Sequence, residues 1–294
     1  MSSDRPVYFS RFFVAILGLI AAASAVFFFF LPAFRGDIIV SPDLHIGPVR
    51  LHWYGITMAL AILAGFIFAY RLAAPRFGIA PKAVEGALLW LVLGGFLGAR
   101  FYYVAFAWDY FSLHPEEALA FWRGGLSIYG AIAGGSIALF IYAKVARLSA
   151  LRFLDIGAAA LPLAQAIGRF GNFFNYEAFG LPTMLPWKMF VPASLRPPQY
   201  LQSQYFHPAF LYEAAWNVAV FLVLLYLIRG KAPRPGLLAG SYLILYSLGR
   251  FWIEPLRLDS FFLGGIRVDQ LVALVAMAAG AALISITYAF QKDN

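Results

Sequence analysis

The 294-residue chain has no cysteine and few charged residues. The absence of cysteine excludes disulfides, thiolate metal sites and a cysteine nucleophile. Only 12% of the residues are charged and 62% are apolar, whereas a typical soluble domain is about 25% charged. The four histidines form no HExxH pattern and no cluster, so no metal site is expected. This composition excludes intrinsic disorder and an ordinary soluble enzyme, and it indicates a polytopic membrane protein.

Apolar runs along the chain predict an all-α protein with about eight transmembrane helices, since a spanning helix needs about 20 mostly apolar residues. The runs are too continuous for a membrane β-barrel, whose segments alternate in polarity. The predicted spans cover residues 12–31, 53–73, 84–106, 126–146, 152–168, 210–228, 236–253 and 268–289. The fifth is short, and we expect it to end at Gly168-Arg169.

Basic residues in the short loops predict the orientation. When eight spans alternate, one side collects Arg71, Arg76, Lys82, Lys144, Arg147, Arg152, Arg229, Lys231, Arg234 and Lys292. The positive-inside rule places this side and both termini in the cytoplasm. The longer connections then face outward: 32–52, 107–125, 169–209 and 254–267. These loops account for the net charge of +8, so binding to nucleic acid is not expected.

The first apolar run defines the predicted division of the chain. Arg5 and Arg11 precede it and small residues follow, a pattern that a signal peptide shares. A retained helix is favoured because the apolar run continues past any such cleavage point. Residues 1–49 are therefore predicted to be an extra N-terminal span with its outward connection. Residues 50–290 would form the membrane core, with the loop 169–209 as part of a small outer cap.

Charged groups inside a bilayer are costly, so each needs a reason. The candidates are Arg100, Asp155, Arg169, Glu177, Glu213, Arg250, Glu254 and Asp269. Nearly all fall toward the outer ends of the predicted spans, which predicts one polar cluster near the outward interface. The alternative for each residue alone is snorkelling to the headgroups or a structural ion pair.

Two segments carry most of the polar residues. Tyr246, Arg250 and Glu254 share one helix face at i, i+4 and i+8, and Arg257 continues that face if the helix persists past Pro255. Arg250 either pairs with Glu254 or holds a phosphate through its bidentate fork. The second segment is residues 168–177, where an arginine, two asparagines and a glutamate are too many for a mere helix end.

Other motifs are less informative when taken singly. The glycines of 124–135 are typical of close helix packing. His207-Pro208 opens the sixth predicted span, and a surface or capping histidine is the favoured interpretation. Ser127 has no histidine partner identifiable from the sequence, so a serine hydrolase is not indicated.

Taken together, these segments resemble the prolipoprotein diacylglyceryl transferase family of the bacterial inner membrane. The matching pieces occur in the family's order across about residues 50 to 270. They are His52-Trp53-Tyr54-Gly55, Gly98-Ala99-Arg100 with Tyr103, Gly124-Gly125-Leu126-Ser127, Asp155, Gly168-Arg169-Phe170-Gly171-Asn172-Phe173-Phe174-Asn175 with Glu177 and Gly180, His207-Pro208 with Leu211-Tyr212-Glu213, and Arg250 with Glu254.

The resemblance implies a reaction and a set of site residues. The family transfers the diacylglyceryl group of phosphatidylglycerol to the lipobox cysteine of a prolipoprotein at the outer, periplasmic face of the membrane. It releases glycerol phosphate and uses no metal or organic cofactor. The catalytic residues so implied are Arg169, Arg250, Tyr129, Tyr54 and Glu254. The substrate-binding residues are Arg169, Asn172, Glu177, Gly180, Arg100, Arg250, His52, Glu213, Tyr246 and Asp155.

The chain departs from the family pattern in two places. Tyr129 stands where the family's best-studied form has a histidine proposed as a base, and the span 12–31 precedes the matching region. The proton acceptor is therefore open among Tyr129, Tyr54 and a glutamate. Two alternatives remain: a transporter or flippase for an anionic lipid, and a catalytically lapsed family member. The first would predict paired broken helices in two related halves, which the sequence does not show.

Overall fold

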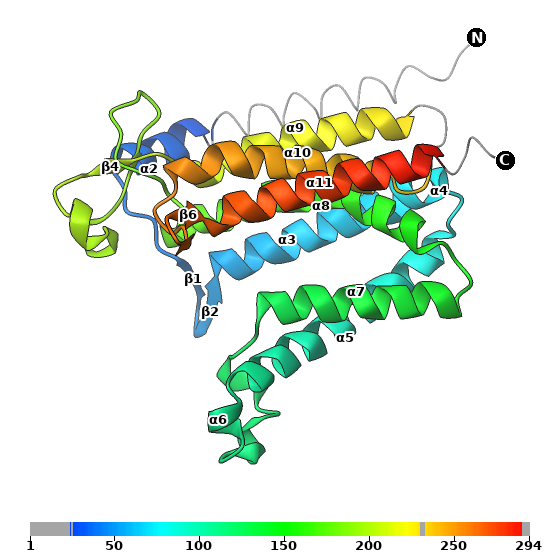
Figure 1. Ribbon diagram of the computed structural model, residues 1–294. Helices are drawn as coiled ribbons and strands as arrows, with labels where there is room; N and C mark the ends of the chain where they lie inside the picture. Colours follow the sequence, from blue (N-terminus) through cyan, green and yellow to red (C-terminus); the bar gives the residue numbers. More distant parts are fainter. Residues whose placement is uncertain (1–23, 25, 230–232, 290–294) are drawn as a thin grey trace, which may run out of the picture.

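The computed structural model describes residues 24, 26–229 and 233–289. Within these ranges the chain is mainly helical (Figure 1), which confirms the all-α polytopic prediction. The long helices are α3 (Trp53–Phe68), α5 (Pro81–Phe106), α7 (Ile128–Val145), α8 (Ala150–Asn175), α9 (Ala209–Arg229), α10 (Leu237–Ile253) and α11 (Val268–Ala289). Helix α8 lies against α3, α9 and α10, whereas α5 packs along α7 and α10 packs along α11.

Short elements complete the chain. The short α-helices are α2 (Leu31–Arg35), α4 (Ala74–Arg76) and α6 (Trp108–Phe111), and π-helical turns precede α2 (Val26–Phe30) and α4 (Ala69–Ala73). The strands are β1 (Asp43–Ile46), β2 (Val49–His52), β3 (Met189–Phe190), β4 (Tyr205–Phe206), β5 (Phe262–Leu263) and β6 (Ile266–Arg267). The 3₁₀ turns are Pro115–Glu117, Phe121–Arg123, Ala193–Leu195, Pro198–Tyr200 and Glu254–Leu256. Strands β1 and β2, β3 and β4, and β5 and β6 pair as antiparallel ribbons. Helices α2 and α6 and the ribbons lie at one end of the helices, and α4 lies at the other (Figure 1).

Six described helices are long and apolar enough to cross a membrane, judged by length and composition. They are Trp53–Arg76, Pro81–Phe106, Ile128–Val145, Ala150–Asn175, Ala209–Arg229 and Val268–Ala289. The predicted span 236–253 corresponds to α10, which has 17 residues. At 1.5 Å per residue α10 is about 25 Å long, slightly less than the hydrocarbon core of about 30 Å. Most of the predicted span 12–31 lies outside the described residues, so the count of eight stays a prediction.

The predicted end of the fifth span at Gly168-Arg169 is wrong, because α8 continues to Asn175. Gly168 and Gly171 do not stop the helix; they let it approach α3. A Cβ atom on Gly171 would come within 2.9 Å of the Tyr54 ring. The helix ends where Tyr176 adopts a left-handed conformation with φ of 50°. Tertiary packing therefore keeps α8 helical past glycines that weaken an isolated helix.

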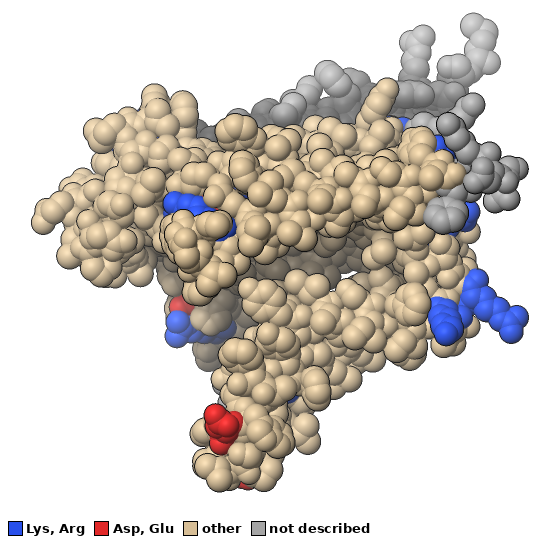
Figure 2. All heavy atoms as spheres, viewed as in Figure 1, with Lys and Arg blue, Asp and Glu red and all other residues tan. Residues whose placement is uncertain are grey.

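Helices α5 and α7 form a close hairpin because each carries glycines four residues apart. Gly94 and Gly98 on α5 face Gly130 and Gly134 on α7, and a Cβ atom on Gly98 would lie 2.8 Å from the Cα atom of Gly134. Small residues at this spacing allow helix backbones to approach closely in a membrane. The hairpin diverges from α8–α11 toward the α6 end (Figure 1), and the molecular surface is hollowed between the two parts (Figure 2).

An aromatic cluster holds the end of α8 in place. Phe173 is buried, with 1% of its surface exposed. Its ring centroid lies 5.0 Å from that of Phe30, which precedes α2, and Phe34 of α2 stacks on the same ring at 5.9 Å. Phe210, at the start of α9, packs on it as well, at 6.2 Å. The segment around α2 therefore braces the turn of α8 that follows Arg169.

Candidate functional site

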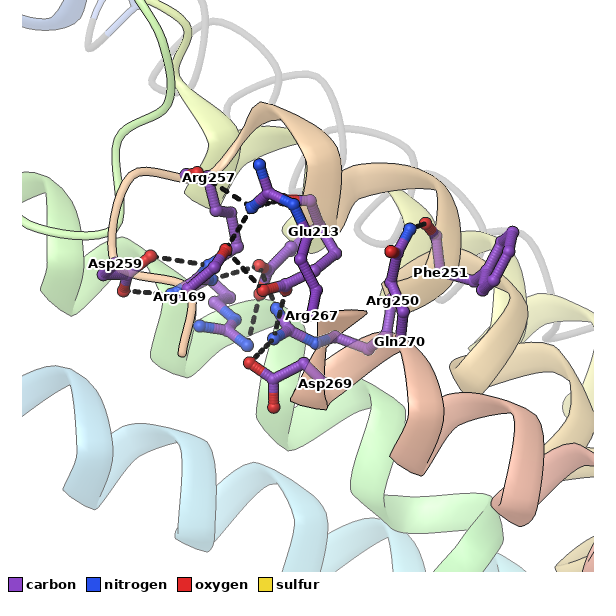
Figure 3. A network of polar contacts seen from close by, with 11 residues as sticks. Arg169, Glu213, Arg250, Phe251, Arg257, Asp259, Arg267, Asp269 and Gln270 are labelled. Atoms are coloured by element: carbon purple, nitrogen blue, oxygen red, sulfur yellow. Dashed lines mark hydrogen bonds and ion pairs between the residues drawn. The ribbon is translucent and has the colours of Figure 1, made fainter. Parts of the chain in front are cut away.

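Charged side chains gather where α8 and α10 end and α9 and α11 begin (Figure 3). We call this group the arginine–carboxylate cluster. Its members are Arg169, Glu213, Arg250, Glu254, Arg257, Asp259, Arg267 and Asp269. The cluster includes most of the charged residues that the sequence predicted to meet near the outward ends of the spans.

Glu213 is the central carboxylate of the cluster. It lies in the second turn of α9 and only 3% of its side chain is exposed. It accepts a hydrogen bond of 2.7 Å from Nη1 of Arg250 and another from Arg257, and it forms an ion pair with Arg169. A buried carboxylate is tolerated when it is paired. Glu213 therefore fastens α9 to α8, to α10 and to the loop after α10.

Glu254 is the second buried carboxylate, in the 3₁₀ turn that follows α10. Its side chain is 0% exposed. It accepts hydrogen bonds from Nη2 of Arg250 at 2.8 Å and from Oγ of Ser260 at 2.7 Å. The structure thus contains the pair of Arg250 and Glu254 that the spacing allowed. Arg250 is not saturated by it, because the same guanidinium also reaches Glu213 and Asp269.

Arg257 enters the cluster from a loop rather than from a helix face. Helix α10 ends at Ile253, and the backbone at Arg257 is extended with ψ of 147°. Its guanidinium binds Asp259 through Nε at 2.9 Å. Burial disfavours the charge on Arg257, but Asp259 and Glu213 outweigh burial and raise its pKa. Burial likewise acts to raise the pKa of Asp259, yet the hydrogen bonds and charge of Arg257 prevail and lower it.

The sequence reasoning missed Asp259, Ser260 and Arg267. The ribbon of β5 and β6 brings Arg267 back to the cluster, where its Nη1 donates to the backbone oxygen of Glu254 at 3.0 Å and to Ser260. The turn of this ribbon is Gly264-Gly265, both with positive φ. A glycine pair between two short apolar runs is a hairpin signal, and it would have placed Arg267 opposite Phe262.

Asn172 lies in the last turn of α8, and Glu177 and Gly180 lie on the loop that follows it. Asn172 donates to Glu177 at 2.8 Å, and the Glu177 side chain is exposed. Gly180 forms a β-bridge with Arg257. A Cβ atom on Gly180 would lie 2.5 Å from the backbone oxygen of Leu256, so only glycine lets this loop lie against the segment that contains Arg257. The structure therefore places these three residues beside the cluster.

Tyr54 and Tyr246 occupy different sides of this region. Tyr54, in the first turn of α3, contacts α8 at Gly171. Tyr246 lies one turn before Arg250 and, with Glu213 and Asn217, lines a small pocket that is partly open to the surface. Asn217 is 2% exposed, and its Oδ1 has no hydrogen-bond partner among the described residues. Polar groups thus continue one helical turn beneath the cluster.

Arg100 and Tyr129 belong to the hairpin of α5 and α7 instead, so the expectation of one polar cluster is wrong for Arg100. Arg100 is 6% exposed. Its guanidinium donates to backbone oxygens of the α6 end of the hairpin, at 2.6 to 3.0 Å; the acceptors are Glu117, Ala118, Gly124 and Gly125. Tyr129 is 70% exposed and lies 6.3 Å from the ring of Tyr102 on the same hairpin.

Asp155 and His52 also lie outside the cluster. Asp155 is fully buried at the opposite end of α8, where it accepts from the backbone N–H groups of Gly236 at 2.6 Å and Ala239 at 2.8 Å. It therefore caps the start of α10, at the end of the bundle opposite to the cluster.

His52 pairs with Asp43 on the ribbon of β1 and β2. A hydrogen bond from Arg50 is the main cause that lowers the pKa of Asp43.

The chemistry available to the cluster is anion binding. Guanidinium groups present several N–H donors in a planar fork that fits phosphate and carboxylate oxygens. Within the described ranges, histidine, aspartate and glutamate side chains form no group of three or more that could hold a metal ion. The arrangement can therefore hold and stabilise negative charge near the ends of four helices.

Known proteins resemble this chain over most of its length. The sequence profile of the prolipoprotein diacylglyceryl transferase family matches residues 43–286. A phosphatidylglycerol–prolipoprotein diacylglyceryl transferase of Thermosynechococcus vestitus is 48% identical over 239 residues, which cover 81% of this chain and 89% of the relative. One from Fervidobacterium nodosum is 42% identical over 274 residues, covering 92% and 94%. The chain belongs to the prolipoprotein diacylglyceryl transferase family.

Proposed function

We propose that this chain transfers the diacylglyceryl group of phosphatidylglycerol to the lipobox cysteine thiol of a prolipoprotein, the first step of lipoprotein maturation. The observation that carries the proposal is that Arg169 and Arg250 meet at Glu213 from two helices. The relatives named above are transferases for this lipid and this class of protein. The proposal requires no metal or organic cofactor.

The reaction defines what the protein must do. The thiol sulfur of the prolipoprotein attacks the carbon that joins the diacylglyceryl group to the phosphate. A carbon–sulfur bond forms, and the bond between this carbon and the phosphate ester oxygen breaks. Glycerol phosphate leaves with the electron pair of the broken bond. The thiol proton is lost, and negative charge grows on the phosphate oxygens as the diester becomes a monoester. A site for this reaction needs fixed donors aimed at phosphate.

Arg169 and Arg250 are the proposed phosphate ligands. Glu213 and Glu254 hold the two guanidinium groups in place before a lipid arrives, so little reorganisation is needed during the reaction. The same positive charges would favour the thiolate form of the attacking cysteine. Asn172, Glu177 and Gly180 would position substrate from the end of α8 and the loop that follows it. Removing one such fixed donor typically raises a barrier by about 3–4 kcal/mol.

The proton acceptor is proposed from Tyr54, Tyr129 and the glutamates of the cluster. Tyr54 contacts α8 within one turn of Arg169, whereas Tyr129 contacts Tyr102 on its own hairpin. The contact with α8 favours Tyr54 as the tyrosine that acts beside the arginines. Tyr129 would then act on substrate from the hairpin of α5 and α7.

We infer that the protein lies in the bacterial cytoplasmic membrane with the cluster toward the periplasm and both termini in the cytoplasm. The support is electrostatic, because basic side chains gather at the end opposite to the cluster, around α4 and the end of α7 (Figure 2). The absence of cysteine makes a labelling test direct. In intact spheroplasts, Ser112→Cys should react with a membrane-impermeant maleimide and Ser149→Cys should not. Labelling of Ser149→Cys before permeabilisation would contradict this orientation.

The activity test uses purified protein in phosphatidylglycerol micelles with a synthetic lipobox peptide. We expect the peptide to gain the mass of diacylglyceryl, with release of glycerol phosphate, only when its cysteine is present. Arg250→Ala and Arg169→Ala should each reduce the rate by roughly a hundred- to a thousandfold. Arg250→Lys keeps the charge but not the fork, and it should restore only part of the rate. The matched control is Arg76→Ala, at the opposite end of the molecule.

One result would overturn the transferase activity, and another would overturn the assignment of the phosphate ligands. If folded wild-type protein gives no mass gain while a control transferase works in parallel, the chain is a transporter or a lapsed enzyme. If Arg250→Ala and Arg169→Ala keep wild-type rates, the phosphate is bound elsewhere. Thermal unfolding of each variant in the same detergent separates a lost function from a lost fold.

A further inference from the structure

Asp269 differs from the other carboxylates on Arg250 in its exposure. Its side chain is 47% exposed, whereas those of Glu213 and Glu254 are 3% and 0% exposed. It lies in the first turn of α11, directly after the ribbon of β5 and β6. Arg250 is therefore enclosed by buried acids on its inner side and faces an exposed acid on its outer side.

The contact between Asp269 and Arg250 is also the longest of the three. Oδ2 of Asp269 is 3.3 Å from Nη2 of Arg250, while Glu213 and Glu254 approach the same guanidinium to 2.7 and 2.8 Å. The two glutamates have further partners that would be lost if they moved, Arg257 for Glu213 and Ser260 for Glu254. Breaking a buried ion pair is costly, but an exposed pair contributes little. Of these three acids, Asp269 is the one that can leave Arg250 at the smallest cost in free energy.

An incoming lipid phosphate needs the same donors. A phosphodiester is an anion, so it cannot share the outer side of Arg250 with a carboxylate without repulsion. We propose that Asp269 is a displaceable counter-ion, which occupies Arg250 in the empty enzyme and is exchanged for a phosphate oxygen when the lipid binds. This inference rests on the proposed role of Arg250 as a phosphate ligand. Asp269 acts through Arg250 and is a positioning residue, not a catalytic one.

The start of α11 gives Asp269 a place to go. The N-terminal turn of a helix presents free N–H groups and a partial positive charge, which stabilise an acidic side chain in that turn. Asp269 can therefore turn away from Arg250 into solvent and keep a favourable environment. Glu213 and Glu254 stay in place, so the orientation of Arg250 is preserved through the exchange.

The consequence is competition between Asp269 and phosphate that an amide would remove. Asp269→Asn keeps the size of the side chain but removes its charge. We expect its KM for phosphatidylglycerol to fall by about two- to fivefold, the range that the loss of an exposed ion pair implies. We expect kcat to change by less than about twofold, because the groups that hold Arg250 in the transition state are unchanged. Free glycerol phosphate should inhibit the variant more strongly by the same factor.

The experiment compares wild type, Asp269→Asn, Asp269→Glu and Asp37→Asn in the peptide assay. Asp269→Glu keeps the charge and should retain the wild-type KM. Asp37→Asn removes an exposed acid that lies outside the cluster and should also match wild type. Binding of glycerol phosphate to each purified protein, measured by titration calorimetry, gives a readout that needs no turnover. The advantage of Asp269→Asn should shrink at high salt, because exposed charges are screened.

The outcomes separate this inference from the proposed function. A lower KM and tighter glycerol phosphate binding in Asp269→Asn alone would support the exchange. An unchanged or higher KM, with Arg250→Ala inactive, would overturn the counter-ion role while leaving the phosphate site in place. If Arg250→Ala is fully active, the phosphate role of Arg250 and the counter-ion role of Asp269 both fall, while the transferase activity stands. A large loss of kcat in Asp269→Asn with an unchanged melting temperature would assign Asp269 to the chemistry and would also overturn the inference.

Discussion

Arg250 on α10 and Glu213 on α9 are joined by a hydrogen bond of 2.7 Å that lies inside the helical bundle. The same carboxylate pairs with Arg169 on α8. One acidic side chain thus sets the relative positions of two arginines that come from different helices. The spacing of these guanidinium groups, and with it the proposed fit to a phosphate, depends on Glu213.

Replacing Glu213 by glutamine tests this dependence. The amide leaves Arg169, Arg250 and Arg257 without their shared counter-charge, and loss of one partner of a buried ion pair costs about 3–5 kcal/mol. We expect a lower apparent melting temperature in detergent and a severe loss of transfer activity. Glu85→Gln, an exposed acid on α5, is the matched control. An unchanged melting temperature in Glu213→Gln would show that the arginines do not need this carboxylate.

A second prediction concerns Arg100, which the family resemblance assigns to substrate binding. In the structure its guanidinium binds backbone oxygens of Glu117, Ala118, Gly124 and Gly125. A lysine cannot reach all of them, and each buried carbonyl left unpaired costs about 1–3 kcal/mol. We therefore expect Arg100→Lys to speed amide hydrogen exchange in residues 116–126 by roughly tenfold or more.

The same variant separates a structural role from a binding role. If Arg100 only holds the end of the hairpin, Arg100→Lys keeps the wild-type affinity for glycerol phosphate. Arg71→Lys, an exposed arginine at the other end of the molecule, controls for the change in side chain. Weaker glycerol phosphate binding with unchanged hydrogen exchange would instead support the substrate-binding assignment.

Features that depend on local spacing were predictable from the sequence. The helices follow from apolar runs, and the pair of Arg250 and Glu254 follows from their separation of four residues on one helix. The segment 168–177 was singled out because an arginine, two asparagines and a glutamate are many for a helix end, although its residues up to Asn175 belong to α8. In each case the information lies within about ten residues of chain.

Features that depend on contacts between helices were not predictable in this way. Asp155 looks like one more intramembrane acid, yet it caps α10, more than eighty residues later in the chain. Gly168 and Gly171 resemble a helix stop in the sequence, yet α3 packs against them and α8 continues. Arg267 joins the cluster only because a glycine turn folds β6 back.

The close contact of α5 and α7 gives a third prediction. Gly98→Ala places a Cβ atom 2.8 Å from the Cα atom of Gly134, and backbone cannot move aside as a flexible side chain does. We expect a destabilisation of about 1–3 kcal/mol, measured as a lower melting temperature in detergent. Gly157→Ala is the matched control, because open space surrounds its Cβ position and alanine favours the helix. A Gly98→Ala protein as stable as wild type would contradict the packing.

The last prediction is a pH dependence that arises at His207. Burial lowers the pKa of His207 below its ordinary value of 6.5. Nε1 of Trp187 donates to the Tyr212 hydroxyl at 2.7 Å, and that hydroxyl lies 3.0 Å from Nδ1 of His207. With Trp187 as its donor, Tyr212 is free to donate to His207, which must then be neutral at Nδ1. The folded protein therefore binds a proton at His207 less readily than the unfolded chain does.

The sign of the effect follows from that difference. A histidine with a lowered folded pKa contributes stability above the unfolded value near 6.5, and the contribution is lost as the pH falls through the folded pKa. We expect the apparent melting temperature in detergent to fall between pH 7.5 and pH 5, on the order of a few degrees. His207→Gln should lose this part of the slope, whereas His114→Gln, at the α6 end, should keep it. If His207→Gln shows the wild-type slope, other groups cause the pH dependence, and the protonation state of His207 does not affect the stability of the fold.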